Sequence, residues 1–363
     1  MTNTQEILKQ FGIEVDADAI RPLGSGLIND TFRVTTPCND TPDYVLQRIN
    51  HAIFTDVDCL QRNIEAATNH IRRKLEAKGT PDIARHCLRF LQVPSTGKTY
   101  YYDGNSYWRV MEFIPDAYTY DAVTPEYAYY AGLGFGDFES MLADIPEKLE
   151  ESIPDFHNME LRLRQLEEAI AADKAGRVAG VADLIEQLRS RADHACLAER
   201  LHREGKLPKR ICHCDTKINN MLFDADGNIL CVIDLDTLMP SFVFSDFGDF
   251  MRTAANTAAE DEPNTDLVNF NMEVFEAFTR GYLQSAGGFL TDVEIENLPY
   301  AAERFAYMQA IRFLADYLNG DTYYKIQYPE HNLVRTRAQF KLLQSIDQHL
   351  DEMKAVVDKY RKK

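Results

Sequence analysis

Carboxylate and amide side chains gather in one short stretch of this sequence, residues 213–234. Asp215 and Asn220 stand five positions apart, and Asp234 follows an apolar run. Carboxylate and amide oxygens are hard ligands of the kind that Mg²⁺ prefers, and proteins commonly bind this ion together with the phosphates of a nucleotide. The stretch therefore indicates a phosphate-handling site, provided that folding brings the three side chains together.

A β-hairpin would bring these side chains together. The dipeptide at 226–227 is Asp-Gly, a strong signal for a tight turn between two strands. With residues 225 and 228 paired across that turn, Asn220 and Asp234 meet at the open end of the hairpin, beside the loop that precedes it. The alternative is an acidic surface hairpin without chemistry, which the apolar flanks of the stretch disfavour.

The spacing from His213 to Asn220 reads H-x-D-x-x-x-x-N, which is the catalytic-loop pattern of kinases. In that pattern the aspartate, here Asp215, accepts the proton of the attacking hydroxyl, and the asparagine holds a metal ion. Asp234 would be the second metal ligand. Positioning and neutralisation of charge would then carry most of the catalysis.

A second aspartate competes for the role of metal ligand. Residues 246–248 read Asp-Phe-Gly, the metal motif of protein kinases. They lie well past the open end of the predicted hairpin, so the register favours Asp234. For Asp246 and Asp249 we expect a structural role, as hydrogen-bonding groups beneath the catalytic loop.

A glycine-containing loop precedes the strand predicted at 31–35. It contains Gly24, Ser25, Gly26, Asn29 and Thr31, and its backbone amides could cradle phosphates, although a plain hairpin turn is the alternative.

The following strand, YVLQRI at 44–49, offers Arg48 in place of the usual lysine. Glu65 on the next helix is its candidate partner. The two could equally form a solvated ion pair of little energetic value.

The elements that position these residues divide into two kinds. Before Pro115 the sequence predicts strands at 31–35 and 44–49, an amphipathic helix over 60–75 that ends at Gly79, and a hairpin over 99–114. After it the chain is mainly helical, with apolar periodicities at 181–195 and 305–318, and a β island at 219–235. We therefore predict an α+β fold of two lobes, a small N-terminal nucleotide-binding lobe (1–115) and a larger helical lobe (116–363) that carries the catalytic loop.

Composition excludes several classes of protein. The 363 residues are 45% hydrophobic and 26% charged, which is typical of a globular protein. A net charge of −18 argues against nonspecific binding to nucleic acid or to an anionic membrane. The seven cysteines form no CxxC pair and suit a reducing compartment. With no visible signal peptide and no apolar run of about 18 residues, we expect a cytoplasmic protein.

Several longer motifs resemble those of the N-acetylhexosamine 1-kinases, in the aminoglycoside-phosphotransferase superfamily. They are HCDTKINNMLFD, CVIDLDTLMP, SDFGDFMR, IRFLADYLNGDTYY and YPEHNLVRTR. The likeness runs from about Gly24 to about Leu343. It implies a bilobal, protein-kinase-like fold, the use of ATP with Mg²⁺, and transfer of the γ-phosphate to the anomeric hydroxyl of a small sugar acceptor, N-acetylglucosamine or N-acetylgalactosamine.

The resemblance also implies roles for individual residues. Asp215 would be the base and a sugar contact, with Asn220 and Asp234 as metal ligands. The remaining implied contacts are Arg312 and Tyr323 to the sugar, and main-chain groups near Glu112 and Phe113 to adenine. Arg312 lies in the apolar stripe of its helix, and an ion pair with Asp316 is the simpler explanation for it.

Two positions depart from the pattern of those kinases. Leu27 stands where they carry a histidine, and Thr253 stands where they carry a phenylalanine. The resemblance implies that both positions border the sugar pocket, so the acceptor stays open among a sugar, an aminoglycoside and choline. A nucleotide-binding module without catalysis is the alternative from a different functional class.

Overall fold

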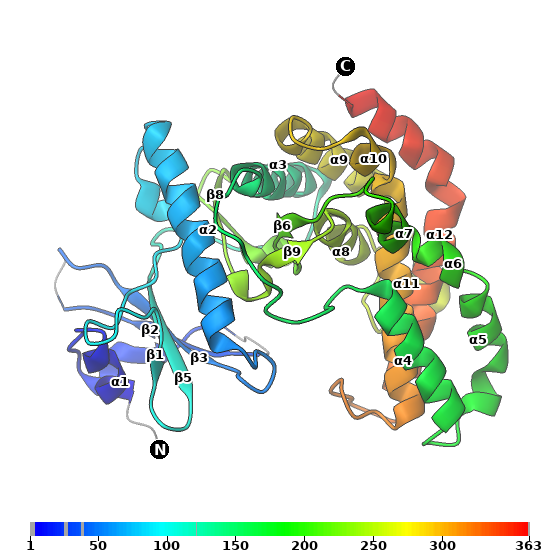
Figure 1. Cartoon of the computed structure of the whole chain (residues 1–363), viewed down its shortest axis with the longest axis horizontal. Helices are drawn as coiled ribbons and strands as arrows, with labels where there is room; N and C mark the ends of the chain where they lie inside the picture. Colours follow the sequence, from blue (N-terminus) through cyan, green and yellow to red (C-terminus); the bar gives the residue numbers. More distant parts are fainter. Residues whose placement is uncertain (1–3, 25–27, 38–39, 121, 362–363) are drawn as a thin grey trace. The chain divides into compact units, whose positions relative to one another are not determined.

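The structure is a computed structural model that describes residues 4–24, 28–37, 40–120 and 122–361. It divides into two compact units (Figure 1). The first unit comprises Met1–Thr119, Asp144–Pro154 and Met221–Met239, and the second comprises Tyr120–Ala143, Asp155–Asn220 and Pro240–Lys363. A β-rich unit and a larger helical unit confirm the predicted α+β fold.

The division differs from the single boundary that we expected at Pro115. Two later segments, 144–154 and 221–239, belong to the first unit. The buried side chain of Asn63 explains part of this, because its amide nitrogen donates to the carbonyl oxygens of Glu150 (2.7 Å) and Leu238 (3.1 Å). One buried amide thus fastens both segments to the same helix.

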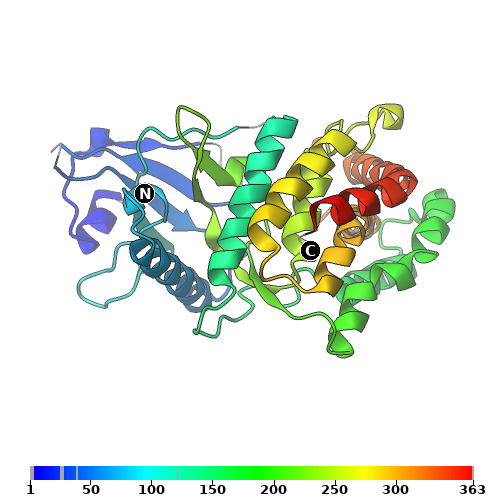
Figure 2. The same cartoon turned by 90° about the horizontal axis from the view of Figure 1, so that it is seen from above.

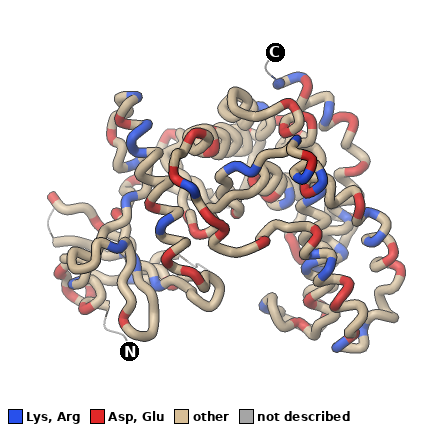
Figure 3. The backbone as a smooth tube through the Cα atoms, in the orientation of Figure 1, with Lys and Arg blue, Asp and Glu red and all other residues tan. Residues whose placement is uncertain are grey.

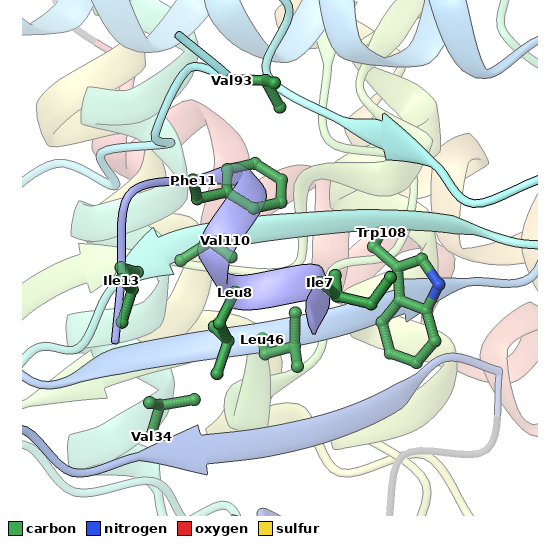
Figure 4. Close-up of a cluster of buried hydrophobic side chains, with 9 residues drawn as sticks. All are labelled: Ile7, Leu8, Phe11, Ile13, Val34, Leu46, Val93, Trp108 and Val110. Carbon is green, nitrogen blue, oxygen red and sulfur yellow. The ribbon is translucent and has the colours of Figure 1, made fainter. Parts of the chain in front are cut away.

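The first unit is built on a five-stranded antiparallel sheet in the order β1-β2-β3-β5-β4. The strands are β1 (Ile20–Pro22), β2 (Asp30–Val34), β3 (Tyr44–Ile49), β4 (Tyr101–Tyr102) and β5 (Tyr107–Glu112). They confirm the predicted strands and hairpin. One face packs against α1 (Thr4–Gln10), where Leu8 meets Leu46 and Val110 in a buried apolar cluster (Figure 4).

Helix α2 (Val57–Ala77) confirms the periodicity of the 60–75 segment. Its apolar positions are buried, and Gly79 ends it with a left-handed backbone (φ +68°), which glycine adopts at low cost.

The β island forms the hairpin β7 (Met221–Phe223) and β8 (Ile229–Val232). Met221 lies opposite Val232, which is the predicted register. The predicted pairing of 225 with 228 is wrong, because a bulge after Leu222 shifts the register and the turn closes between Asp224 and Asn228. The side chain of Asp224 accepts the backbone N–H of Asn228 (2.8 Å), which favours the wider turn.

The second unit is mainly helical. Its elements are α3 (Pro125–Leu142), α4 (Met159–Ala172), α5 (Ala182–Arg189), α6 (Ala192–Ala195), α7 (Leu197–Arg203), β6 (Arg210–Cys212), β9 (Met239–Ser241), α8 (Phe244–Ala254), α9 (Met272–Ala286), α10 (Asp292–Glu296), α11 (Leu298–Asn319) and α12 (His331–Tyr360). The periodicity at 305–318 lies inside α11, as predicted. The single helix expected over 181–195 is instead broken at Ser190, whose hydroxyl donates to the carbonyl of Gln187 (2.7 Å).

Helices α3 and α9 lie side by side in two views (Figures 1 and 2). Glycines permit this close approach, because a Cβ at Gly132 would lie 2.3 Å from the carbonyl oxygen of Phe278, and one at Gly281 would lie 2.1 Å from that of Tyr129. Acidic and basic residues are interspersed along α4 and α12 (Figure 3). Over the described ranges, no helix has the length and apolar character needed to span a bilayer.

Candidate functional site

The loop after β6 carries Asp215 and is held from below by Asp246, in the first turn of α8. The carboxylate of Asp246 accepts the backbone N–H groups of His213 and Cys214, each at 2.7 Å. The hydroxyl of Thr216 donates to the backbone carbonyl of Asp246 (2.6 Å). Burial raises the pKa of Asp246, which is about 1% exposed. The structural role predicted for Asp246 is confirmed.

The backbone of this loop is in an unusual conformation. Cys214 has a left-handed backbone (φ +63°), which costs free energy in any residue with a side chain. His213 is fully buried and meets the rings of Phe135 and Phe138 edge-on, and its Nδ1 accepts the backbone N–H of Asp215 (3.3 Å). Packing and hydrogen bonds together therefore hold the shape of the loop.

Asp215 is joined to two neighbouring side chains. The ammonium group of Lys217 lies 2.6 Å from Oδ1 of Asp215. The amide nitrogen of Asn220 donates to the backbone carbonyl of Asp215 (2.8 Å) and to its Oδ2 (3.3 Å). The structure therefore brings together Asp215 and Asn220, as predicted from their spacing.

Lys217 was not identified from the sequence. Burial lowers its pKa, but the negative charges of Asp215 and Asp249 outweigh burial, so that the net shift is upward. A lysine two residues after an aspartate in an irregular loop has no periodicity that would predict the contact.

The chemistry of Asn220 suits a divalent cation. The side chain is mostly buried, and its amide nitrogen is turned toward Asp215, which leaves the amide oxygen as its available ligand atom. A side-chain carbonyl oxygen is a ligand type that Mg²⁺ accepts. Within the described ranges no group of three or more His, Cys, Asp or Glu side chains is arranged to hold a metal ion.

Asp234 belongs to the first unit and follows β8 by one residue. Its backbone is left-handed (φ +60°), a strained conformation for an aspartate. Met221 opposite Val232 puts Asp234 just past the open end of the hairpin, the end from which β7 starts. The next turn, Leu235–Thr237, contains the buried Asp236.

The side chains of Asn29 and Thr31, in the described part of the glycine loop, form hydrogen bonds to other residues of the first unit. Gly24 has φ +71°, while Ser25, Gly26 and Leu27 lie outside the described residues. The amide nitrogen of Asn29 donates to Asp236 (2.6 Å), and its oxygen accepts the N–H of Asn50. The hydroxyl of Thr31 accepts a hydrogen bond from Gln47 (3.1 Å). A phosphate contact from this part of the loop would have to come from backbone amides.

Arg48 and Glu65 do not form the pair that we considered. Arg48 is about half exposed and pairs with Asp30, whereas Glu65 accepts a hydrogen bond from Gln92 (3.2 Å). Side chains alternate along a strand, so Arg48 lies on the opposite face of β3 from Gln47.

The backbone N–H groups at the end of β5 are largely used by the sheet. Glu112 donates to the carbonyl of Arg89 (2.9 Å), and Phe113 donates to that of Asp43 (2.8 Å). Since Pro115 has no N–H, Ile114 carries the next backbone donor along this segment.

Arg312 and Tyr323 line one cavity of the second unit, of about 420 Å³. The ion pair considered between Arg312 and Asp316 does not form, because Asp316 accepts the backbone N–H groups of residues 322–324. Arg312 bonds to the neutral Gln309 (2.8 Å) and lies near the ring of Tyr324. Tyr323 is 69% exposed at this cavity.

The same cavity is lined by three cations, Arg162, Lys174 and Arg312, and by two carboxylates, Glu168 and Asp316. Arg162 donates to neutral acceptors, the side chain of Gln165 and the carbonyl oxygens of residues 155 and 156. Burial and the charge of Arg312 lower the pKa of Arg162 to about 10. Within the part of the chain that the structure describes, none of these three cations has a carboxylate within 4.0 Å.

Arg252, on α8, acts electrostatically on both Asp249 and Tyr324. It pairs with Asp249 (3.0 Å), whose pKa is raised by burial and by the nearby charge of Asp215. Together with Arg312, it also opposes the rise that burial causes in the pKa of Tyr324. Thr253, the next residue, donates its hydroxyl to the backbone carbonyl of Asp249 (3.0 Å), within its own helix.

Three solved structures are similar to this chain. An aminoglycoside phosphotransferase from Alicyclobacillus acidocaldarius is 13% identical, with a TM-score of 0.59 and coverage of 97% of both chains. The amicoumacin kinase hAmiN is 14% identical, with a TM-score of 0.59 and coverage of 96% of this chain and 94% of that one. A choline kinase from Cryptosporidium parvum is 15% identical, with a TM-score of 0.57 and coverage of 99% of both chains. At these identities the likeness establishes the fold.

The family is established by the sequence over most of the chain. Residues 19–287 match the model of the APH phosphotransferase enzyme family. That range includes the glycine loop, the loop of Asp215 and Asn220, the hairpin and Asp234, so the matching part contains the motifs on which the kinase interpretation depends. This chain therefore belongs to the APH phosphotransferase enzyme family.

Proposed function

We propose that this phosphotransferase moves the γ-phosphate of ATP to the anomeric hydroxyl of a free sugar, with an N-acetylhexosamine as the preferred acceptor. The observation that carries the proposal is the environment of Asp215, a carboxylate held by Lys217 at 2.6 Å and by the amide of Asn220. A half-buried, oriented carboxylate in a fixed loop has the properties of a general base.

In the proposed reaction, the sugar hydroxyl gives its proton to Asp215 as its oxygen bonds to the γ-phosphorus. The bond between that phosphorus and the bridging oxygen breaks, ADP leaves, and the sugar 1-phosphate is formed. Asn220 and Asp234 would hold Mg²⁺, which when bound neutralises charge on the phosphates. The similar structure of hAmiN was determined with AMP-PNP and Ca²⁺, which supports a nucleotide and a divalent cation as ligands.

We propose that the first unit holds the nucleotide. The resemblance assigns adenine to main-chain groups near Glu112 and Phe113, but their N–H groups donate within the sheet. Ile114 is therefore the better candidate for the backbone donor. Phosphate contacts from the glycine loop would come from its backbone, around Gly24, Ser25 and Gly26.

The charge of the cavity at Arg312 supports an uncharged acceptor. Three cations, Arg162, Lys174 and Arg312, line it against two carboxylates, Glu168 and Asp316, and Asp316 already accepts three backbone N–H groups. The excess of positive charge disfavours a cationic aminoglycoside or choline. Guanidinium groups donate readily to the hydroxyl and acetamido oxygens of a sugar. The exposed ring of Tyr323 offers an apolar surface for a sugar face. We place the acceptor in this cavity. From the resemblance, we propose Leu27 and Thr253 as further acceptor contacts.

A panel of acceptors scored by ADP release tests the proposal. It should contain N-acetylglucosamine, N-acetylgalactosamine, glucose, galactose, choline and an aminoglycoside, and the product should be located by phosphorus NMR. We expect the N-acetylhexosamines to give the highest kcat/KM and a 1-phosphate. A preference for choline or the aminoglycoside would refute the acceptor, and nucleotide binding without turnover on any acceptor would favour a binding module.

Two variants test the roles proposed for Asp215 and Arg312. Asp215→Asn should lower kcat by about 10²–10⁴-fold with the fold retained, because it removes the base. Arg312→Gln should raise the KM of the acceptor but not that of ATP. Arg189→Gln is a matched control, since Arg189 is half exposed and pairs with Glu167 in the same unit. Near wild-type turnover by the Asp215 variant would show that another group accepts the proton.

A further inference from the structure

A polar network, buried at Arg109, Asp236 and Asn29 and partly exposed at Gln47 and Thr31, crosses the sheet of the first unit and ends beside Asp234. The guanidinium of Arg109 on β5 lies 2.5 Å from the carboxylate of Asp236, and its Nε donates to Gln47 on β3 (2.9 Å). Gln47 in turn donates to Thr31 on β2 (3.1 Å), and Asn29 donates to Asp236 (2.6 Å). Three strands and the glycine loop are thus connected to the turn that follows Asp234.

The register of the strands explains why these side chains meet. Thr31 pairs with Gln47, and Gln47 pairs with Arg109, so the three stand in one row across β2, β3 and β5. Side chains on neighbouring strands at paired positions share a face of the sheet. Arg48, one position from Gln47, is on the other face. The cation in contact with the turn after Asp234 is therefore Arg109.

The ion pair between Arg109 and Asp236 is almost completely removed from solvent. The side chains of Arg109 and Asp236 are 2% and 4% exposed. Two charges taken out of water lose solvation that their mutual attraction regains only in part, and apolar residues of similar size often give equal or greater stability. In some proteins, buried charged or polar groups of this kind are what specifies the geometry. Here that geometry concerns the turn 235–237, which directly follows Asp234 and its strained left-handed backbone.

We propose that Arg109 is the positioning residue of the metal-ligating carboxylate. Its ion pair with Asp236 fixes the turn of residues 235–237 against the sheet, and thereby sets the direction in which Asp234 presents its carboxylate. Arg109 acts through Asp236 and does not itself touch the phosphates. The inference rests on the proposed use of Mg²⁺ with ATP, but not on the identity of the acceptor.

The test is the gain in nucleotide affinity that Mg²⁺ provides, measured without any acceptor. Binding of AMP-PNP is followed by calorimetry with and without Mg²⁺ for the wild-type protein, for Arg109→Lys, and for the double variant Arg109→Gln/Asp236→Asn. The double variant removes both charges, so neither is left buried alone. The matched control is Arg33→Gln/Asp43→Asn, the same change at a more exposed pair of the same unit.

We expect the double variant to lose about tenfold or more of the Mg²⁺-dependent gain, while its affinity in the absence of Mg²⁺ stays within about threefold of wild type. Arg109→Lys should retain part of the gain, and the control should retain all of it. A folded double variant with lower thermal stability but the wild-type Mg²⁺-dependent gain in AMP-PNP affinity would show that the pair has only a structural role. That result would overturn the inference.

If the double variant does not fold, Arg109→Lys decides the question. Lysine keeps the charge but lacks the forked geometry of arginine, so the gain should fall by about threefold or more if geometry is what matters. A full wild-type gain in that variant would overturn the inference. A wild-type protein that gains nothing from Mg²⁺ would refute the proposed use of the metal, and this inference with it.

Discussion

Two buried aspartates, Asp236 and Asp246, each support a segment proposed to do chemistry, and they do so by different means. Asp236 holds the turn after Asp234 through the side chains of Arg109 and Asn29. Asp246 holds the loop of Asp215 through two backbone N–H groups. The support by Asp236 depends on which side chains stand at positions 109 and 29. The support by Asp246 depends only on the position of the loop's backbone N–H groups. The two segments should therefore respond differently to mutation.

The largest difference should appear in turnover. Asp234→Ala removes a proposed metal ligand, so we expect kcat with Mg²⁺ and ATP to fall by about 10³-fold or more. Asp246→Asn keeps an oxygen acceptor beneath the loop, so its kcat per folded molecule should stay within about tenfold of wild type. Steady-state assays on folded, purified variants measure both. An equal loss in the two variants would show that Asp246 takes part in the chemistry.

The next difference concerns the free energy of unfolding. Asp236→Asn leaves the guanidinium of Arg109 buried without a counter-charge, which should cost about 3–5 kcal/mol. Asp246→Asn weakens hydrogen bonds to neutral donors, which should cost about 1–3 kcal/mol. Urea denaturation at pH 7 gives both values. A larger cost at Asp246 would contradict the view that the ion pair is the more sensitive support.

The smallest effect extends the comparison to His157, a partly exposed residue whose ring Nδ1 is buried without a hydrogen-bond partner among the described residues. His157 is packed between Phe156 and Phe305, and burial, together with Arg312 and other arginines, holds its pKa well below the usual value of 6.5. Below pH 6.5 the unfolded chain therefore binds a proton that the folded chain excludes, and stability falls as the pH falls.

His157→Phe removes this group and keeps the aromatic packing. Relative to wild type, the free energy of unfolding of the variant should rise by up to about 2 kcal/mol between pH 7.5 and pH 5. Urea denaturation at the two pH values measures it. A difference between the two proteins that does not change with pH would show that His157 binds its proton equally well in the folded and the unfolded chain.

Local patterns predicted much of this structure. The helix over 57–77 follows from apolar spacing, and the register of Met221 with Val232 follows from a turn signal and the alternation of side chains. The bulge after Leu222 does not, since it depends on a side chain, Asp224, that reshapes the turn.

Contacts between distant parts of the chain were not predictable in this way. In the sequence, Arg109 is simply one residue of a predicted strand. No residue near it in the sequence indicates that its partner is Asp236. Arg312 was identified because a charge interrupts an apolar stripe, but the three backbone N–H groups that occupy Asp316 lie in an irregular turn without periodicity. Local spacing of apolar residues predicts where a residue lies on a helix or strand. It does not predict which residue far along the chain will contact it.

The order of the segments in the first unit has a consequence for biosynthesis. That unit needs residues 144–154 and 221–239 in addition to the first 119. When the ribosome has released only the N-terminal sheet, Arg109 has no Asp236 to meet, and at about 5–20 residues per second the missing hairpin emerges several seconds later. A fragment that ends near Thr119 should therefore be a poor expression product, and the nascent sheet is the stage at which chaperones would be needed most.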